Sequence, residues 1–507
     1  MKTTRPRSLS SPETATLPPD ASTNGAGIVS LPPSAAAGNG YSVNGNGTLP
    51  PDDDLAAVLL GETADDDGNA KCAHALFGRE FLYAEAYGWM HWTGTHWRAD
   101  EGEAHIDRAL FAVLKQRRMA AVSAGKEAVV KATAGTARRV RDCKMAFRSL
   151  VTVGVDDFDQ SPDELNVANG ILDLRTGELA PHDPARRFAY CSKVPYDPVA
   201  DDSAWRGFLA DAVSGGEDVL DYLQMAVGYS LTGHTSEECL WYIYGPSRSG
   251  KGIFTEVLLA ILGSPLSIEV DFATFTAKRE GDTQNFDLAP LKPTRLVITS
   301  ESNRYEVLNA GKIKQLTGGN FVRAAYKHRD LFTYRPQFKA WLVSNQPVNA
   351  DVDDDALWYR VKVLEFPNGH AGQEDKTLKP RMKAADNLRG VLRWAVEGAK
   401  RWYAAPTGLE HPNWVKLATR EHRAELDYVQ SWLDERCEEV PGAWIANSAL
   451  YASYENWCKS GGIQPKALRG LLMSLKNKGF TIGEQRKIDG QNGKGVVGIA
   501  LSIRGGA

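Results

Sequence analysis

The sequence predicts an α/β protein, and three observations lead to this prediction. A run of apolar residues, CLWYIY at 239–244, passes through a glycine-rich turn into an amphipathic helix pattern, KGIFTEVLLAILG at 251–263. Two further apolar runs follow at 295–302 and 338–348. Short apolar runs bounded by turn residues are typical of buried strands, and their alternation with helix patterns favours the α/β class. The length of 507 residues indicates several domains rather than one.

The bulk composition indicates a cytoplasmic protein without a membrane partner. Apolar residues make up 43% of the chain, which is enough for packed cores. No run of about eighteen apolar residues suggests a membrane span, and the first residues lack the apolar stretch of a secretory signal. The six cysteines are scattered without a C-x-x-C pair, which favours reduced thiols over a disulfide framework or a cysteine zinc site.

The first part of the chain divides into a tail and a mixed domain. Residues 1–70 are rich in Pro, Ser, Gly and Asn and predict a disordered low-complexity tail. Residues 71–200 predict an α+β domain. Aromatic and polar residues alternate around Thr93-Gly94, which indicates a hairpin, and residues 104–150 have a basic, helical pattern. Short strands joined by turns are expected at 165–184.

The rest of the chain divides into a sheet domain and a basic C-terminal domain. Residues 201–405 predict the α/β domain with a helical lead-in. Residues 406–507 contain two helix patterns, a short Gly-Gly turn between them, and a hairpin pattern at the end. This order is that of a winged helix. Four basic residues near its second helix are candidates for binding duplex DNA: Lys466, Arg469, Lys476 and Lys478.

The glycine-rich turn resembles a phosphate-binding loop with one substitution. The usual pattern is G-x-x-x-x-G-K-[ST], but Gly252 occupies the hydroxyl position. Between a strand and a helix, such a loop binds phosphates through backbone amides and a lysine. Water could replace the missing magnesium ligand, and Thr255 is a poorer substitute because it lies almost one helical turn further on. The predicted ATP-binding residues are Gly245, Pro246, Ser247, Arg248, Ser249, Gly250, Lys251 and Gly252.

Three polar residues at later strand ends are candidate catalytic groups. Glu301 could polarise water and help to hold Mg²⁺, although a solvated glutamate would look the same. Asn345 could orient water against the outer phosphate, although an asparagine at a strand end is often only a turn former. Arg360, at the start of the next predicted strand, could act on the nucleotide of a neighbouring subunit, and a structural salt bridge is the alternative.

Two basic segments predict contact with nucleic acid in spite of a net charge of −4. DNA affinity depends on local Lys and Arg, and 10 basic residues against 2 acidic ones lie between 115 and 148. The segment RAAYKHRDLFTYRP at 323–336 adds two tyrosines to its cations, which suits a grip on single-stranded DNA. An exposed basic hairpin without ligand is the alternative. Its candidate residues are Arg323, Lys327, His328 and Arg329.

Taken together, GPSRSGKG, RLVITSE, the segment from IKQLTGGN to SNQPV, and WYRVKVLEF resemble the superfamily-3 helicase module. The chain is similar to the phage/plasmid primase-helicase family, whose N-terminal domain is shared with poxvirus-type primase-helicases. The resemblance covers about residues 80–370. It implies an AAA+-like P-loop core, a ring that is a homo-hexamer, and 3′→5′ travel. It assigns Lys251 to the loop, Glu301 to the strand-end acid, Asn345 to the sensor and Arg360 to the finger. It also places the 327–329 hairpin in a central channel. Asn320 replaces the family's usual Asp.

The sequence therefore predicts an ATP- and Mg²⁺-dependent DNA helicase that replicates a phage or plasmid-like element. Primer synthesis by this chain is not expected, because no paired-carboxylate site precedes the helicase part, so a separate primase or polymerase is an expected partner. Two other functions stay open. One is an origin-binding initiator that uses ATP as a switch without unwinding. The other is a small-molecule phosphotransferase, suggested by the G-K-G ending of the loop.

Overall fold

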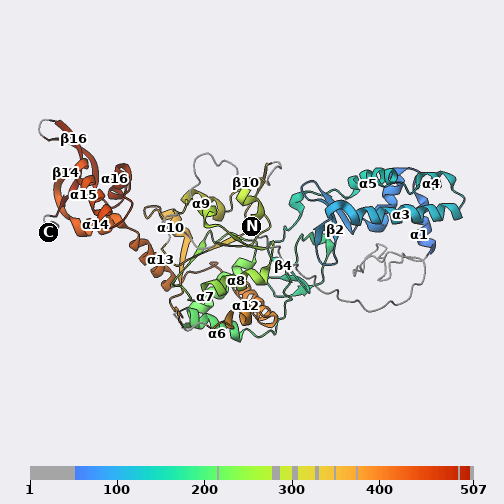
Figure 1. Ribbon diagram of the computed structural model, residues 1–507, viewed down its shortest axis with the longest axis horizontal. Coiled ribbons are helices and arrows are strands. Elements are labelled where there is room, and N and C mark those ends of the chain that lie inside the picture. Colours follow the sequence, from blue (N-terminus) through green and yellow to red (C-terminus); the bar gives the residue numbers. More distant parts are fainter. Residues whose placement is uncertain are drawn as a thin grey trace, which may run out of the picture.

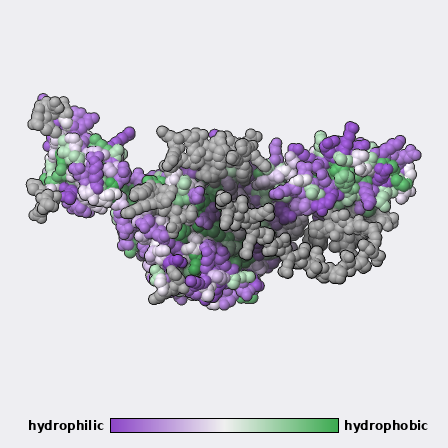
Figure 2. All heavy atoms as spheres, viewed as in Figure 1, coloured by the Kyte–Doolittle hydropathy of each residue, from purple (hydrophilic) through white to green (hydrophobic). Residues whose placement is uncertain are grey.

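The computed structural model describes residues 52–213, 216–276, 286–299, 307–325, 331–347, 350–372, 375–488 and 491–502. Three groups of elements lie along its longest axis (Figure 1). A helical N-terminal group and a small C-terminal group lie at opposite ends, and a domain built on a parallel sheet lies between them. Figure 2 shows hydrophobic residues in the middle of this central domain and mostly hydrophilic residues on the flanks.

Five parallel strands form the central sheet, in the order β13-β7-β12-β9-β8. Their bounds are β7 (Leu240–Tyr244), β8 (Ser267–Val270), β9 (Leu296–Thr299), β12 (Lys339–Ser344) and β13 (Val361–Glu365). The middle strands are buried almost throughout, which explains their continuous apolar runs. The α/β class is thereby confirmed. Because all five strands are parallel, their carboxyl ends meet at one edge.

Helices cover both faces of the sheet, and alternate strand residues serve the two faces. Trp241 and Trp341 stack with ring centroids 4.6 Å apart in one hydrophobic core, whereas their neighbours Tyr242 and Leu342 belong to the other. The first face packs against α6 (Ser203–Ala212), α7 (Gly216–Leu231), α8 (Lys251–Leu262) and α12 (Ala385–Ala404). The second packs against α9 (Ala310–Thr317), α10 (Asp355–Arg360), α13 (Asn413–Glu425) and the hairpin of β10 (Val322–Ala325) and β11 (Leu331–Tyr334).

The helices α7 and α12 touch through their backbones at two glycines. A Cβ atom on Gly228 would lie 2.1 Å from the backbone nitrogen of Ala399. A Cβ atom on Gly398 would lie 1.9 Å from the carbonyl oxygen of Gln224. Neither position can accept a side chain without moving a helix, so the two glycines set the separation of the helix pair below the sheet.

The N-terminal group confirms the predicted hairpin but begins earlier than we predicted. Trp92 pairs with Trp97 across the Thr93-Gly94 turn. The boundary at residue 70 is wrong, because two helices precede or cross it. Buried Arg117 donates to carbonyl oxygens of Leu59, Glu62 and Thr63, and so ties these helices to the rest. The elements are α1 (Asp52–Gly61), α2 (Asp66–Phe77), β1 (Phe81–Ala84), β2 (Gly88–Trp92), β3 (Trp97–Ala99), α3 (Ala104–Ser123), α4 (Glu127–Ala132) and α5 (Ala137–Val151).

The predicted boundary at residue 200 also differs from the packing. The expected short strands are present as β4 (Glu164–Val167), β5 (Gly170–Asp173) and β6 (Leu179–Ala180). The apolar side chains of β4 and β5, and several that follow as far as Tyr196, join the core of the sheet domain, whereas β6 is exposed. Ser192 Oγ donates to the carbonyl oxygen of Ile261 at 2.7 Å. This segment therefore packs as part of the central domain.

The C-terminal group contains the two predicted helices and the predicted hairpin. A helix and a strand precede them in the chain. Its sheet has the order β14-β16-β15. It begins near residue 428 rather than 406, because α13 packs on β13, where Val363 N donates to Thr419 Oγ1. The elements are α14 (Tyr428–Arg436), β14 (Cys437–Ala446), α15 (Asn447–Ser460), α16 (Leu468–Asn477), β15 (Thr481–Ile488) and β16 (Gln491–Leu501).

Two global features complete the fold. All six cysteines are free thiols, and four of them are buried. Among the helices that the structure describes, none combines the length and the apolar character needed to cross a bilayer.

Candidate functional site

The chain turns sharply at the carboxyl end of β7, where residues 245–250 form a loop that leads into α8. A Cβ atom on Gly245 would lie 2.1 Å from the carbonyl oxygen of Phe366, so the close approach requires glycine. Gly250 precedes the helix with φ 89°, in the left-handed region that glycine adopts without strain. Arg248 has φ 65°, which is unfavourable for a residue with a Cβ atom. The loop conformation is thus fixed by local backbone geometry.

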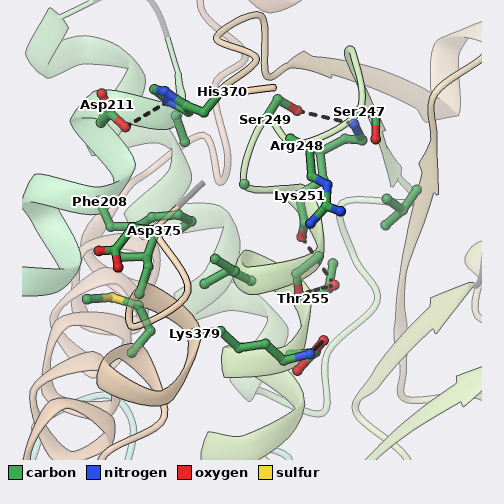
Figure 3. Close-up of a pocket in the computed structure, with 18 of the residues that line it drawn as sticks. Phe208, Asp211, Ser247, Arg248, Ser249, Lys251, Thr255, His370, Asp375 and Lys379 are labelled. Atoms are coloured by element: carbon green, nitrogen blue, oxygen red, sulfur yellow. Dashed lines mark hydrogen bonds and ion pairs between the residues drawn. The ribbon is translucent and has the colours of Figure 1, made fainter. Parts of the chain in front are cut away.

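Lys251 is the first residue of α8, and its side chain folds back over the loop (Figure 3). Its Nζ donates to the carbonyl oxygens of Gly245 at 2.8 Å and Pro246 at 2.7 Å, and to Ser249 Oγ at 3.1 Å. The first amides of a helix lack intrahelical acceptors and carry partial positive charge. The ammonium group and the start of α8 therefore concentrate positive charge at one point, which suits an anion.

A cavity of about 1200 Å³ opens beside this loop. Its walls come from three directions: α6, the carboxyl ends of β9 and β12, and the segment that follows β13, with α11 (Leu378–Met382). His370 Nε2 lies 3.0 Å from Asp211 Oδ2, so these two side chains meet between the last wall and α6 (Figure 3). Phe208 and Leu378 add apolar surface. A cavity with apolar walls and a few charged groups is typical of a small-molecule site.

Two threonine hydroxyls line the cavity near the loop. Thr255 Oγ1 donates to backbone carbonyls of Lys251 and Gly252, both at 3.2 Å. Thr299, at the end of β9, is 1% exposed, and its Oγ1 has no partner within the described residues. A buried hydroxyl normally has a hydrogen-bond partner. Both hydroxyls thus line the same cavity as Gly252, the loop position that lacks a hydroxyl.

The structure brings some of the predicted catalytic residues together and separates others. Asn345 follows β12, which pairs with β7, and it lines the same cavity as the loop. Glu301 lies outside the described residues. Arg360 ends α10 instead of beginning a strand, which corrects our prediction. It lies at the amino end of β13, opposite the loop, and its side chain is 15% exposed and pairs with Glu238 at 2.5 Å. Glu238 is thus the partner that the alternative interpretation, a structural ion pair of Arg360, requires.

The predicted DNA-binding residues fall into three groups. Lys327, His328 and Arg329 lie outside the described residues, whereas Arg323 is exposed on β10. Arg469 and Lys476 are exposed on α16. Two further lysines are engaged by acids: Lys466 Nζ lies 2.8 Å from Asp353 Oδ2, and Lys478 Nζ lies 2.6 Å from Asp427 Oδ2.

One wall of the cavity lies far from the loop in sequence and was not predicted. Lys379 and Arg381 on α11 line the cavity, as do Asp211 on α6 and Asp375. Lys379 Nζ pairs with Glu256 on α8 at 2.6 Å. The only signal in the sequence was KTLKPRMK at 376–383, with four basic residues in eight. That segment matches no motif, and only the tertiary fold brings it to the loop.

Two family models match two separate segments of the chain. Residues 70–214 match the family described as D5 N terminal like, and residues 243–360 match a family of unknown function (DUF5906). "Putative helicase L207/L206" of Acanthamoeba polyphaga mimivirus is 24% identical over 327 residues, covering 60% of this chain and 34% of that protein. "Putative helicase 022R" of Frog virus 3 is 22% identical over 258 residues, covering 46% and 26%. The chain thus spans about a third or less of these relatives.

Solved structures of the NrS-1 C-terminal region are also similar. One apo structure has a TM-score of 0.40 and 13% identity, covering 61% of this chain and 80% of that chain.

A parallel sheet with a glycine loop and a cavity at its carboxyl edge defines an α/β protein whose cavity lies where α/β proteins commonly bind ligands. Three further observations indicate which kind of α/β protein this is. They are the D5-type domain, the viral relatives with helicase names, and the motifs at residues 245–252 and 295–301. Together, these similarities support a relationship of this chain to phage and viral primase-helicases.

Proposed function

We propose that the chain is an ATP-driven DNA helicase for replication of a phage or plasmid-like element. One observation supports this most strongly: the glycine loop with Lys251 and the strand-end residue Asn345 line one cavity at the carboxyl edge of the sheet. β7 lies between β13 and β12 in a sheet ordered β13-β7-β12-β9-β8. That order agrees with the AAA+-like P-loop core of the superfamily-3 module.

ATP would bind with its phosphates on the loop. The Lys251 ammonium would exchange its loop carbonyls for the outer phosphate oxygens, and the amides at the start of α8 would bind the same anion. Asn345 would orient the attacking water. Magnesium, which neutralises charge on the phosphates, would be held by phosphate oxygens, water and Glu301, with the Thr255 and Thr299 hydroxyls close by.

We further propose a shared site in a ring, expected to be a hexamer. Arg360 lies at the end of β13 opposite the loop, so within one chain it points to a different edge of the sheet. It would act on the nucleotide of the adjacent subunit after exchanging Glu238 for phosphate. Next to it, Tyr359 is 70% exposed, so the chain reaches the surface at this position.

DNA would contact two separate surfaces. The hairpin of β10 and β11 would carry Lys327, His328 and Arg329 to a single strand in the channel, with Arg323 on its exposed side. The C-terminal group would act as a winged helix on duplex DNA through Arg469 and Lys476, which are exposed on α16. A separate primase or polymerase would be a further partner.

One alternative has a specific observation in its favour. A small-molecule phosphotransferase needs basic side chains that close over the phosphates from within the same subunit. Lys379 and Arg381 on α11 line the cavity of this chain and could have that role. A phosphotransferase would turn over without DNA, whereas the helicase would depend on it.

ATP hydrolysis and strand displacement on a forked DNA substrate test the proposal. Wild type should hydrolyse ATP, faster with DNA, and separate the strands. Lys251→Ala should lower both activities at least about a hundredfold, the order expected when a preorganised charge contact is lost. Lys71→Ala removes an exposed lysine far from the cavity and should behave as wild type.

Three outcomes would contradict the proposal. Equal hydrolysis by Lys251→Ala and wild type would exclude the loop as the nucleotide site. DNA-independent phosphoryl transfer to a small acceptor would favour the phosphotransferase. Slow hydrolysis with tight duplex binding and no displacement would favour the initiator.

A further inference from the structure

Two histidines and an aspartate meet in the N-terminal group, far along the chain from the cavity. His91 lies on the middle strand β2, Asp100 directly follows β3, and His105 lies in the first turn of α3. Each offers one nitrogen or oxygen atom, and these atoms all lie within 4.8 Å of one another. The two imidazole rings are stacked, with centroids 4.1 Å apart and planes 13° apart.

Asp100 is held in place as a carboxylate. Its side chain is 1% exposed, and it accepts hydrogen bonds from the backbone amides of His105 at 3.0 Å and Ile106 at 2.9 Å, and lies 2.8 Å from His105 Nδ1. Burial alone would raise the pKa of this carboxyl, but the hydrogen bonds from Ile106 and His105 lower the pKa below its usual value. A charged oxygen donor is therefore fixed at the start of α3.

His91 has a buried nitrogen whose bonding capacity is unused. The residue is 8% exposed, and its Nδ1 has no hydrogen-bond partner within the described residues. Burial lowers the pKa of His91, and the charges of His105 and Arg98 lower it further. An imidazole nitrogen without a hydrogen-bond partner can offer its lone pair to a metal. Buried polar atoms without a partner are rare in proteins and require an explanation.

We propose that His91, Asp100 and His105 bind a divalent transition-metal ion, with zinc as the natural candidate. Two imidazoles and one carboxylate form a donor set that zinc prefers and magnesium does not. Water would supply the fourth ligand, because three protein ligands leave one tetrahedral position open.

The observed geometry indicates which side chain must move. Zinc–ligand bonds of about 2.0–2.2 Å require the three donors to approach one another more closely than 4.8 Å. Stacked rings do not direct their lone pairs to a common point, so one ring must tilt. His91 is buried on the middle strand, whereas the side chain of His105 is 40% exposed. His105 would therefore tilt, so that one of its ring nitrogens faces the metal.

The competing interpretation is purely structural. In that case, Asp100 only caps α3, and the imidazole stack only fills the space above β2. Cobalt distinguishes the two, because tetrahedral Co²⁺ substitutes for zinc and absorbs visible light. The full chain would be stripped with a chelator and titrated with Co²⁺ in excess Mg²⁺, while absorbance and bound metal per chain are measured.

We expect one Co²⁺ per chain, displaced by Zn²⁺ and unaffected by Mg²⁺. His105→Ala should weaken binding at least about tenfold, since even outer partners of a metal ligand have effects of that size. It leaves buried His91 in place, so the fold should persist, which circular dichroism would verify. His74→Ala removes an exposed histidine of the same group and should bind as wild type.

Three results would overturn the proposal. The first is the absence of stoichiometric cobalt at micromolar protein. The second is unchanged binding by His105→Ala. The third is a sulfur-to-cobalt charge-transfer band, which would assign the metal to thiols instead of this cluster.

Discussion

A catalytic site shared between subunits predicts that two inactive variants restore each other's activity. The loop follows β7 and Arg360 precedes β13, and the two strands are parallel and in register from Leu240 to Tyr244. The five residues of β13 therefore separate Arg360 from the level of the loop. At about 3.3 Å per strand residue, this separation is roughly 16 Å, which an arginine side chain cannot span. Arg360 could act only on the nucleotide of another copy.

The assay mixes Lys251→Ala chains with Arg360→Ala chains and measures ATP hydrolysis on single-stranded DNA. Each variant alone leaves every shared site defective. In an equal, random ring about one site in four would join an intact lysine to an intact arginine, so hydrolysis should recover to about a quarter of the wild-type rate if sites act independently. Arg401→Ala removes another ion-paired arginine, on α12, and should keep wild-type activity alone. No recovery at any ratio, although the two variants co-purify in one oligomer, would refute the shared site.

Three further predictions concern stability and the C-terminal group. Burial lowers the pKa of His422 from its ordinary value of 6.5 to about 4 in the folded chain. Between pH 6.5 and pH 4, the unfolded chain therefore binds a proton at His422 that the folded chain does not. The free energy of unfolding should fall by up to about 3 kcal/mol as the pH drops from 6.5 to 4. Urea denaturation should show a weaker fall for His422→Phe. Equal pH profiles for this variant and wild type would contradict the prediction. Gly228→Ala should lower the free energy of unfolding by about 1–3 kcal/mol, because its Cβ atom would meet the backbone of α12. Gly207→Ala, with open space around it, should not lower it. Asp353→Asn should release Lys466 for a DNA phosphate and raise the salt dependence of duplex binding by about one counterion. Fluorescence anisotropy at several salt concentrations would measure this dependence. An unchanged slope of binding affinity against salt concentration would exclude Lys466 from the DNA contact.

Sequence reasoning succeeded where the signal is local. The strand, glycine loop and helix of residues 239–263 are adjacent in the chain, and their apolar periods and the G-K-G turn are sufficient to predict them. The hairpin around Thr93-Gly94 is equally local. Domain boundaries failed because packing decides them. Arg117 fixes the helices around residue 70, and the strands of 164–173 complete a core built mainly from later residues.

The candidate site shows the same division. Asn345 could be predicted because a polar residue at the end of a neighbouring parallel strand must lie near the loop. The cavity wall with Arg381 could not be predicted, because it approaches from more than a hundred residues away without a motif. Ion pairs were also invisible: nothing in the sequence distinguishes Lys466, which pairs with Asp353, from Lys476, which is exposed.

That distinction gives a role to the acidic segment DVDDD at 351–355. Asp354 accepts from Lys314 on α9 at 2.8 Å, and Asp353 pairs with Lys466 of the C-terminal group. Lys466 also donates to Ser474 Oγ at 3.0 Å, so its ammonium is fixed between the two domains. One ammonium cannot pair fully with both an aspartate and a DNA phosphate. If Lys466 binds duplex DNA, that contact must compete with this junction. The exposed residues of α16 would then make the first contact, and any use of Lys466 would loosen the C-terminal group from the sheet domain.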